Sequence, residues 1–143
     1  MYQRKYTPEA ITELQENEVF VFGSNEGGLH MGGAANVAYH KFGACWGEGK
    51  GHHGQSYAIP TLDSKLGKIT RTELKKNIAE FVSYVLMNQN LTFYLTKIGC
   101  GIAGWDIEDV KELFWQAIEE ESTEEASEQS LPANLVIPQE FML

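Results

Sequence analysis

Residues 18–35 read EVFVFGSNEGGLHMGGAA and contain the pattern that decides the fold. The valines and phenylalanines of 18–23, which end at a glycine, predict a buried strand. The glycine pairs Gly27–Gly28 and Gly32–Gly33 predict a loop after it. The alanines that follow predict a helix from about Gly33 to Phe42. A strand, a glycine-rich loop and a helix of small residues, in that order, indicate an α/β protein.

A second unit of the same kind follows at residues 91–106, LTFYLTKIGCGIAGWD. It predicts a strand over 91–99, a glycine-rich loop, and a helix capped by Asp106 and Asp109. Loops after parallel strands meet at one edge of the sheet, where α/β proteins bind ligands. Glycine lets backbone approach a ligand closely, and helix N-termini present free N–H groups. The two loops together therefore predict a cradle for a diphosphate.

The remaining elements complete an alternating pattern. We expect a short helix over about 8–16, a loop over 43–55, a strand over 56–60, a helix after the capping box of Thr70 and Glu73, and a strand over 134–138. Two helices show continuous apolar faces, formed by Leu74, Ile78, Phe81, Val82 and Val85 and by Val110, Leu113, Phe114, Ala117 and Ile118. The expected fold is one domain over 1–143, a three-layer α/β/α arrangement with a mostly parallel central sheet and helices on both faces.

The composition limits the classes of function. No run reaches the ~20 apolar residues of a membrane span, and the N-terminus lacks a secretory segment. Two cysteines do not make a disulfide framework, so we expect a cytoplasmic protein. The net charge is −9, and six acidic residues lie between Glu119 and Glu128. The sequence has no basic stripe with interleaved aromatic residues, which argues against general binding to nucleic acids. The acidic segment 119–130 is interpreted as a helix end, a loop or an insertion.

The stretches VFVFGSNEGGLHMGGAANVAYHKFG and TKIGCGIAGWDIEDV resemble the two ligand loops of macrodomains, a family of ADP-ribose binders and hydrolases. IGCG is especially similar to the macrodomain branch that removes terminal ADP-ribose from glutamate. The whole chain also looks like a group of bacterial and phage macrodomain-like proteins of similar length. The resemblance implies binding of ADP-ribose or a related nucleotide diphosphate, with hydrolysis of ADP-ribosyl derivatives left open.

Roles follow from the matching positions. The resemblance implies that Asn25 lies at the ribose next to the reactive end, with Ser24 beside it, and that Trp105 flanks the cleft. The residues implied next to the ribose and phosphates are Gly28, Gly32 and Gly33, and those implied to give backbone amides to the diphosphate are Gly99, Cys100, Gly101, Ile102, Ala103 and Gly104.

The sequence also departs from the family. The region RKYTPEAIT has no aspartate to hold an adenine amino group, and Ala103 stands where the glutamate-deprotecting branch has an aspartate. That branch uses a lysine nucleophile, and PTLDSK does not align Lys65 with it. The catalytic residues are therefore unassigned. Asn25 and His30 are the candidates, through a water held between them and the phosphate.

Other side chains leave two interpretations open. His30 polarises a ligand group or is a solvated loop residue, and Glu26 and Asp63 are acid–base groups or solvated charges. Cys100 is a reactive thiol whose pKa helix amides depress, or a small buried residue. Trp46 and Tyr57 stack on a base or pack. Cys45, His40, His52 and His53 match no zinc spacing, so no metal and no cofactor are expected.

Two other classes of function remain as alternatives. One is a Rossmann-like nucleotide phosphoribohydrolase, which VFVFGSN echoes, although the chain lacks the PGGxGT loop and following glutamate of that class. The other is a non-catalytic interaction protein of phage or mobile-element origin, whose acidic segment 119–130 is the working surface. The expected partner is a small molecule for a macrodomain-like protein or a phosphoribohydrolase. For the interaction protein, the expected partner is a protein.

Overall fold

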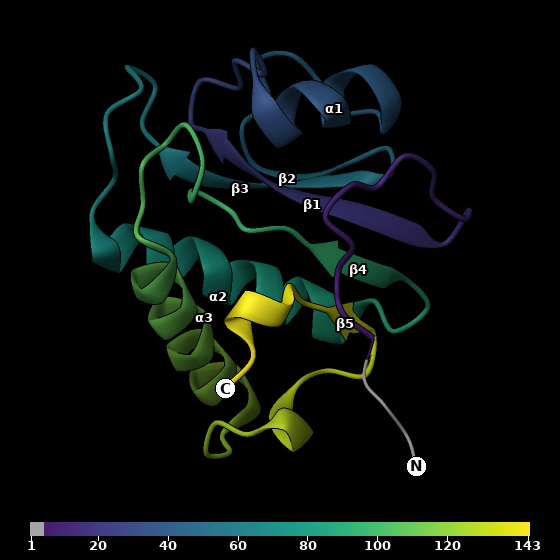
Figure 1. The fold of residues 1–143 in the computed structure, drawn as a ribbon, viewed down its shortest axis with the longest axis vertical. Coiled ribbons are helices and arrows are strands. Elements are labelled where there is room, and N and C mark those ends of the chain that lie inside the picture. The colour runs from purple at the N-terminus through teal and green to yellow at the C-terminus, as the bar shows by residue number, and fades with distance from the viewer. Residues whose placement is uncertain (1–4) are drawn as a thin grey trace.

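A computed structural model describes residues 5–143, so the first four residues of the expected domain lie outside the described part. Its five-stranded sheet has the order β2-β3-β1-β4-β5 (Figure 1). β1 is parallel to β3 and β4, β5 is parallel to β4, and β2 runs antiparallel to β3. The expected α/β class with a mostly parallel sheet is confirmed. The strands are β1 (Glu18–Asn25), β2 (Gly51–His53), β3 (Ser56–Leu62), β4 (Thr92–Leu95) and β5 (Leu135–Val136), and the α-helices are α1 (Gly33–Lys41), α2 (Arg71–Met87) and α3 (Ile107–Ser122).

Side chains of the central strand β1 enter two different apolar clusters, because successive residues of a strand point to opposite faces. Val19 and Val21 pack in the larger cluster, which also contains the buried faces of α2 and α3. Phe20 and Phe22 pack in the smaller cluster, which contains the alanines of α1. Figure 1 accordingly shows α1 on one side of β1 and α2 with α3 on the other.

The helix signals identified in the sequence have the expected contacts. The Thr70 hydroxyl accepts from the Glu73 amide at 3.1 Å, and the Glu73 carboxylate accepts from the Thr70 amide at 3.3 Å, which completes the capping box. Asp106 caps α3 by accepting from the Glu108 amide at 2.9 Å. Asp109 instead forms an ion pair with Arg71 at 2.9 Å and so joins α3 to α2. All ten apolar residues of the two expected faces are buried.

The helix expected over 8–16 is absent, and this segment has no regular structure. The backbone amide of Thr7 donates to Ile137 O at 2.8 Å, and its hydroxyl donates to Val136 O at 3.2 Å. Ile11 and Leu14 pack on the smaller cluster. These contacts hold the segment against the body of the protein, and tertiary contacts of this kind override weak helix propensity.

The strand boundaries also differ from those expected. β3 continues through Pro60 to Leu62, and the β1–β3 register shifts between Ser24 and Asn25, next to the point where Pro60 supplies no N–H. β4 ends at Leu95, because the Ile98 amide donates back to Thr96 O at 2.8 Å and turns the chain. β2 lies inside the expected 43–55 loop, and β5 is only two residues long.

The acidic segment begins as ordered helix. α3 continues to Ser122 and ends where Thr123 adopts a left-handed φ of 60°. Glu120 pairs with Lys75 at 2.6 Å, and a short 3₁₀ helix, η1 (Glu128–Ser130), follows. None of the helices within residues 5–143 is long and apolar enough to cross a membrane.

Candidate functional site

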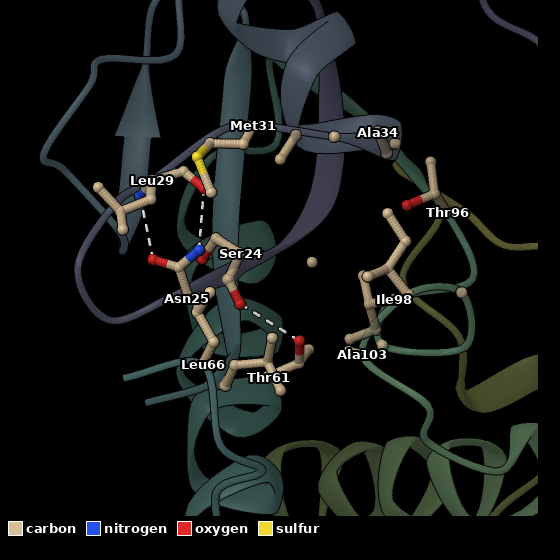
Figure 2. A pocket seen from close by; sticks show the side chains of 18 of the residues that line it. Ser24, Asn25, Leu29, Met31, Ala34, Thr61, Leu66, Thr96, Ile98 and Ala103 are labelled. Carbon is tan, nitrogen blue, oxygen red and sulfur yellow. Dashed lines mark hydrogen bonds between the residues drawn. The ribbon is translucent and has the colours of Figure 1, made fainter. Parts of the chain in front are cut away.

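A cleft of about 580 Å³ lies where the carboxyl ends of β1, β3 and β4 meet. Its volume falls within the range of ~300–1,000 Å³ that is usual for small-ligand sites. Three segments line it: the β1–α1 loop, the end of β3 with the loop to α2, and the β4–α3 loop. In Figure 2, Asn25 and Met31 lie on one side of the cleft and Ile98 and Ala103 on the other. The two glycine-rich loops therefore border one cavity, as the sequence pattern predicts.

The β1–α1 loop is held by its own polar side chains. The Asn25 side chain closes the loop onto Leu29, and the Ser24 hydroxyl donates to the carbonyl oxygen of Gly49. Gly28 has a φ of +69°, and a Cβ there would overlap the backbone of Gly47 and Glu48. Gly28 consequently packs against a neighbouring turn and is not a lining residue, although the resemblance implies that it lies next to the ligand.

Gly32 and Gly33 do line the cleft, at the start of α1. Gly32 is the N-cap residue, and no side chain caps this helix. The amides of Gly33, Ala34 and Ala35 have no acceptor within the helix, since they belong to its first turn. This end of α1 therefore faces the cleft with free donors and the positive end of the helix dipole.

The β4–α3 loop presents backbone amides from the opposite side. Within residues 5–143, the amides of Gly99, Gly101, Ile102 and Ala103 donate no hydrogen bond, and all four residues line the cleft. The amides of Cys100 and Gly104, also expected to contact the diphosphate, are engaged within the loop, and so is that of Trp105, which was expected to flank the cleft and does not line it. The amides of Cys100, Gly104 and Trp105 donate to Lys97 O at 3.2 Å, Gly101 O at 3.0 Å and Gly99 O at 2.7 Å.

The second helix N-terminus differs from the first. Asp106 already caps α3, and Glu108 and Asp109 follow in its first turn. These carboxylates offset the positive end of the helix dipole. The anion-binding capacity of the β4–α3 loop consequently rests on its loop amides and not on the helix end.

The third wall contains residues that sequence reasoning missed: Thr61, Leu62, Leu66 and Lys68. The parallel sheet could have predicted this wall. β3 is parallel to β1, so the loop after β3 must reach the same edge of the sheet as the loop after β1. This loop contains only one glycine, Gly67, so a search for glycine-rich loops passed over it. Its contribution includes a cation, Lys68.

The charge of the cleft is opposite to that of the chain. Its lining, taken over the described residues, has two lysines, Lys68 and Lys97, and no carboxylate, although the chain carries a net charge of −9. Lys97 lies 3.4 Å from Glu9 and 3.3 Å from Glu140, so nearby acids balance its charge. Lys68 forms no ion pair with any residue of 5–143. Within the described residues, the lining therefore carries positive charge and no negative charge.

The lining hydroxyls donate to the protein itself. Thr61 Oγ1 donates to Ser24 O at 3.2 Å, and Thr96 Oγ1 donates to Val21 O at 2.7 Å. With the Ser24 hydroxyl also engaged, the N–H donors left for a ligand are chiefly backbone amides and the Lys68 ammonium. Figure 2 shows Ser24 and Thr61 next to each other and Thr96 on the side of Ile98.

Three exposed apolar side chains surround the cleft: Met31 (63% exposed), Leu66 (46%) and Ile102 (87%). Ile102 Cδ1 lies 3.2 Å from the position that a Cβ on Gly32 would occupy. The two glycine-rich loops thus approach each other at this point. The rim therefore offers apolar surface next to the loop amides that line the cleft.

His30 does not line the cleft. It is fully buried, its Nε2 lies 2.9 Å from Cys45 O, and its ring packs near Phe22 and Trp46. The interpretation of His30 as a solvated loop residue is therefore wrong. Its Nδ1 has no hydrogen-bond partner in the described part of the chain. The ring ties the β1–α1 loop to the 43–50 segment, and no face of it reaches a ligand in the cleft.

Burial raises the pKa of the Cys100 thiol to about 11; the charge of Lys97 opposes this rise, and Asp106 adds a smaller increase. The interpretation of Cys100 as a reactive thiol whose pKa helix amides depress is therefore wrong, because Asp106 caps α3 and the thiol lies half-buried. Cys100 also lies outside the cleft lining. This position favours the interpretation of Cys100 as a small packed residue.

The other candidates lie elsewhere. Asp63 accepts from the amides of Lys65 and Gly67 at 2.8 and 2.9 Å, which makes it a turn-forming residue, and Glu26 is exposed outside the lining. Tyr57 is buried in the larger core cluster, and Trp46 packs on Tyr39. Among residues 5–143, no group of three or more His, Cys, Asp or Glu side chains is placed to hold a metal ion.

Comparison of the chain with protein-family models, with curated proteins and with solved structures gave no match.

Proposed function

We propose that the cleft binds a small phosphate-bearing ligand, ADP-ribose or a related nucleotide diphosphate, mainly through backbone amides of the two glycine-rich loops. The observation that carries this proposal is the set of four amides, from Gly99, Gly101, Ile102 and Ala103, that border the cleft and donate no hydrogen bond within the described chain. Backbone amides that converge on one cavity, opposite an uncapped helix N-terminus, are the usual protein site for phosphate oxygens.

The charge of the cleft supports the same ligand class. The chain has a net charge of −9, but the described lining of this cavity has two lysines and no carboxylate. Such a lining attracts anions and repels cations. In the same proposal, α1 on one side of the sheet and α2 with α3 on the other are the outer layers of a macrodomain-like α/β/α fold.

We propose a binding module rather than a hydrolase. General acid–base hydrolysis needs a carboxylate, imidazole or similar group within hydrogen-bond reach of the ligand. Within residues 5–143, the cleft lining has no carboxylate, imidazole or thiol. The imidazole of His30 is buried outside it, and the Asn25 amide already bonds Leu29. A water held by these two side chains therefore has little support as the nucleophile.

Isothermal titration with ADP-ribose tests the proposal, and the absence of heat at millimolar ligand would overturn it. Gly101 provides a matched pair of variants, because a Cβ there meets nothing within 4 Å and its φ is not positive. Gly101→Asn and Gly101→Asp have nearly the same shape and differ by one negative charge. We expect Gly101→Asp to lose binding by about tenfold or more relative to Gly101→Asn, since the carboxylate competes with phosphate for the loop amides.

A further inference from the structure

Among the described residues, Lys68 is the lysine of the cleft lining that forms no ion pair. It lies in the β3–α2 loop, where Leu62 and Lys68 form an isolated antiparallel bridge. The Asp63 amide donates to Gly67 O at 2.7 Å, and the Asp63 carboxylate accepts from two amides of the same turn. The backbone of Lys68 is consequently fixed next to the cleft by hydrogen bonds that do not use its side chain.

The side chain of Lys68 lies over a fixed aromatic ring. Its Nζ is 5.3 Å from the centroid of Trp105. Trp105 is 8% exposed, its Nε1 donates to Thr61 O at 2.9 Å, and its backbone amide donates to Gly99 O at 2.7 Å. The ring therefore ties the end of β3 to the β4–α3 loop, and the Lys68 ammonium lies over this fixed ring.

No carboxylate of residues 5–143 forms an ion pair with Lys68. The Asp63 carboxylate accepts hydrogen bonds within its own turn, and Asp106 caps α3. An exposed cation on an aromatic face is held weakly, whereas an ammonium–phosphate contact is a charge-assisted hydrogen bond and is stronger. A phosphate in the cleft would thus attract the ammonium from the ring.

We propose that Lys68 is the residue that binds a phosphate group of the cleft ligand and sets the affinity for its charge. The inference rests on the proposed function, because it assigns the counter-charge for the ligand that the loop amides hold. Lys97 does not share this role, since Glu9 and Glu140 already balance it. In this proposal, the Lys68 ammonium from the third wall binds the same phosphates as the loop amides.

The test compares Lys68→Met with Lys65→Met. Methionine keeps an apolar stem over Trp105 and removes the charge, while Lys65 is an exposed lysine of the same turn that does not line the cleft. The probes are ADP-ribose and inorganic pyrophosphate, titrated at low and at high salt. We expect Lys68→Met to weaken both by about tenfold or more and to reduce the salt dependence. Lys65→Met should change the affinity for either probe by no more than about twofold, because salt screens the charge of an exposed lysine outside the cleft.

Two further measurements separate binding from folding. Lys68→Arg keeps the positive charge and should bind within about threefold of the natural protein, a difference of well under one decade. The melting temperatures of all variants should agree. Tryptophan fluorescence should change when pyrophosphate is added to the natural protein, because the ammonium leaves the Trp105 face, and it should change much less in Lys68→Met.

Each outcome decides the inference. If the natural protein binds ADP-ribose and Lys68→Met behaves like Lys65→Met, the role of Lys68 is overturned while the proposed function stands. If it binds pyrophosphate but not ADP-ribose, and Lys68→Met abolishes that binding, the role of Lys68 stands and the nucleotide ligand is wrong. If it binds neither probe, both proposals are overturned.

Discussion

The side-chain amide of Asn25 makes two hydrogen bonds to a single residue, Leu29. Asn25 Nδ2 donates to Leu29 O at 2.9 Å, and Asn25 Oδ1 accepts from the Leu29 amide at 3.0 Å (Figure 2). These bonds close residues 25–29 into a tight loop at the end of β1. Asn25 lines the cleft. The main role of its side-chain amide, however, is to fix the shape of the loop that leads into α1.

Asn25→Asp should therefore destabilise the protein as well as weaken anion binding. The aspartate loses the donor to Leu29 O and places a carboxylate oxygen against that carbonyl, within a buried site. We expect the free energy of unfolding to fall by about 1–3 kcal/mol, the cost of an unsatisfied buried polar group. Urea denaturation measures the loss. Asn90→Asp, on an exposed residue, is the control, and an equal effect of the two variants would show that the Leu29 contacts contribute nothing.

Two glycines of the β1–α1 loop separate backbone strain from steric overlap. Gly28 and Gly33 have similar positive φ values, +69° and +60°. A Cβ on Gly28 would overlap the backbone of Gly47 and Glu48, whereas one on Gly33 meets nothing within 4 Å. Gly33→Ala should cost about 1–2 kcal/mol from the left-handed backbone alone. Gly28→Ala should cost roughly 4 kcal/mol or more, in the range reserved for severe core defects.

Thermal and urea denaturation of the two alanine variants provide the measurement. Equal losses of stability would mean that the 45–49 turn moves away freely, and that Gly28 is needed only for its backbone angle. The comparison also bears on the site, because Gly33 lines the cleft and Gly28 does not. A binding defect larger than the loss of stability explains is therefore expected only for Gly33→Ala.

The parts of this fold that the sequence predicts are those whose signals are local. The capping box of Thr70 and Glu73 and the apolar faces of α2 and α3 depend on spacings of a few residues, and the structure has them as expected. The segment 8–16 has a local helix signal at Thr7 and Pro8, but Thr7 bonds Ile137 and Val136, which are distant in sequence. No local pattern contains that pairing.

The same distinction applies to the cleft. The convergence of the two glycine-rich loops follows from parallel strands, and it could be predicted. The burial of His30 depends on Cys45 O and on Trp46, brought there by a turn that the sequence shows only as a glycine-rich loop. The place of Lys68 depends on Trp105, 37 residues later in the printed sequence. Such pairs are products of the tertiary fold.

The two cysteines should differ strongly in reactivity. Because burial raises the pKa of Cys100 to about 11, its thiol stays protonated at pH 8, whereas Cys45 is exposed. The thiolate is the reactive form, so iodoacetamide should modify Cys45 first. The rate at Cys100 should rise about tenfold for each pH unit while the pH stays below that pKa, since the thiolate fraction grows in this proportion.

Intact-mass time courses on the variants Cys45→Ser and Cys100→Ser measure each thiol alone. Each variant also serves as the control for the other, because it reports modification at the remaining site only. If Cys100 in the Cys45→Ser variant were modified as fast as Cys45 at pH 8, the thiol would be activated. The loop amides would then stabilise the Cys100 thiolate, and Cys100 would again be a candidate functional residue.

The last prediction concerns the base of a nucleotide ligand. Strong discrimination between bases requires polar groups that are left unpaired when the wrong base binds, and such sites reach ratios of about 10⁴ or more. In this cleft the side chains of Ser24, Asn25 and Thr61 already bond the protein itself. The rim offers apolar surface from Met31 and Ile102, which contacts any ring alike. We therefore expect ADP, GDP, CDP and UDP to bind with affinities within about tenfold of one another, a spread of ~1.4 kcal/mol.

Competition of each nucleoside diphosphate against one fluorescent ligand measures that spread directly. Ile102→Ala is the informative variant, because Ile102 is 87% exposed and its removal should leave the fold intact. It should weaken all four nucleotides by a similar factor, since it removes apolar contact and no hydrogen bond. A preference of about a thousandfold or more for one base would require a polar group that recognises that base, since apolar contacts alone discriminate similar groups by no more than ~10–200-fold. The group that recognises the base would then have to be a backbone group of the cleft or the Lys68 ammonium, because the side chains of Ser24, Asn25 and Thr61 are engaged.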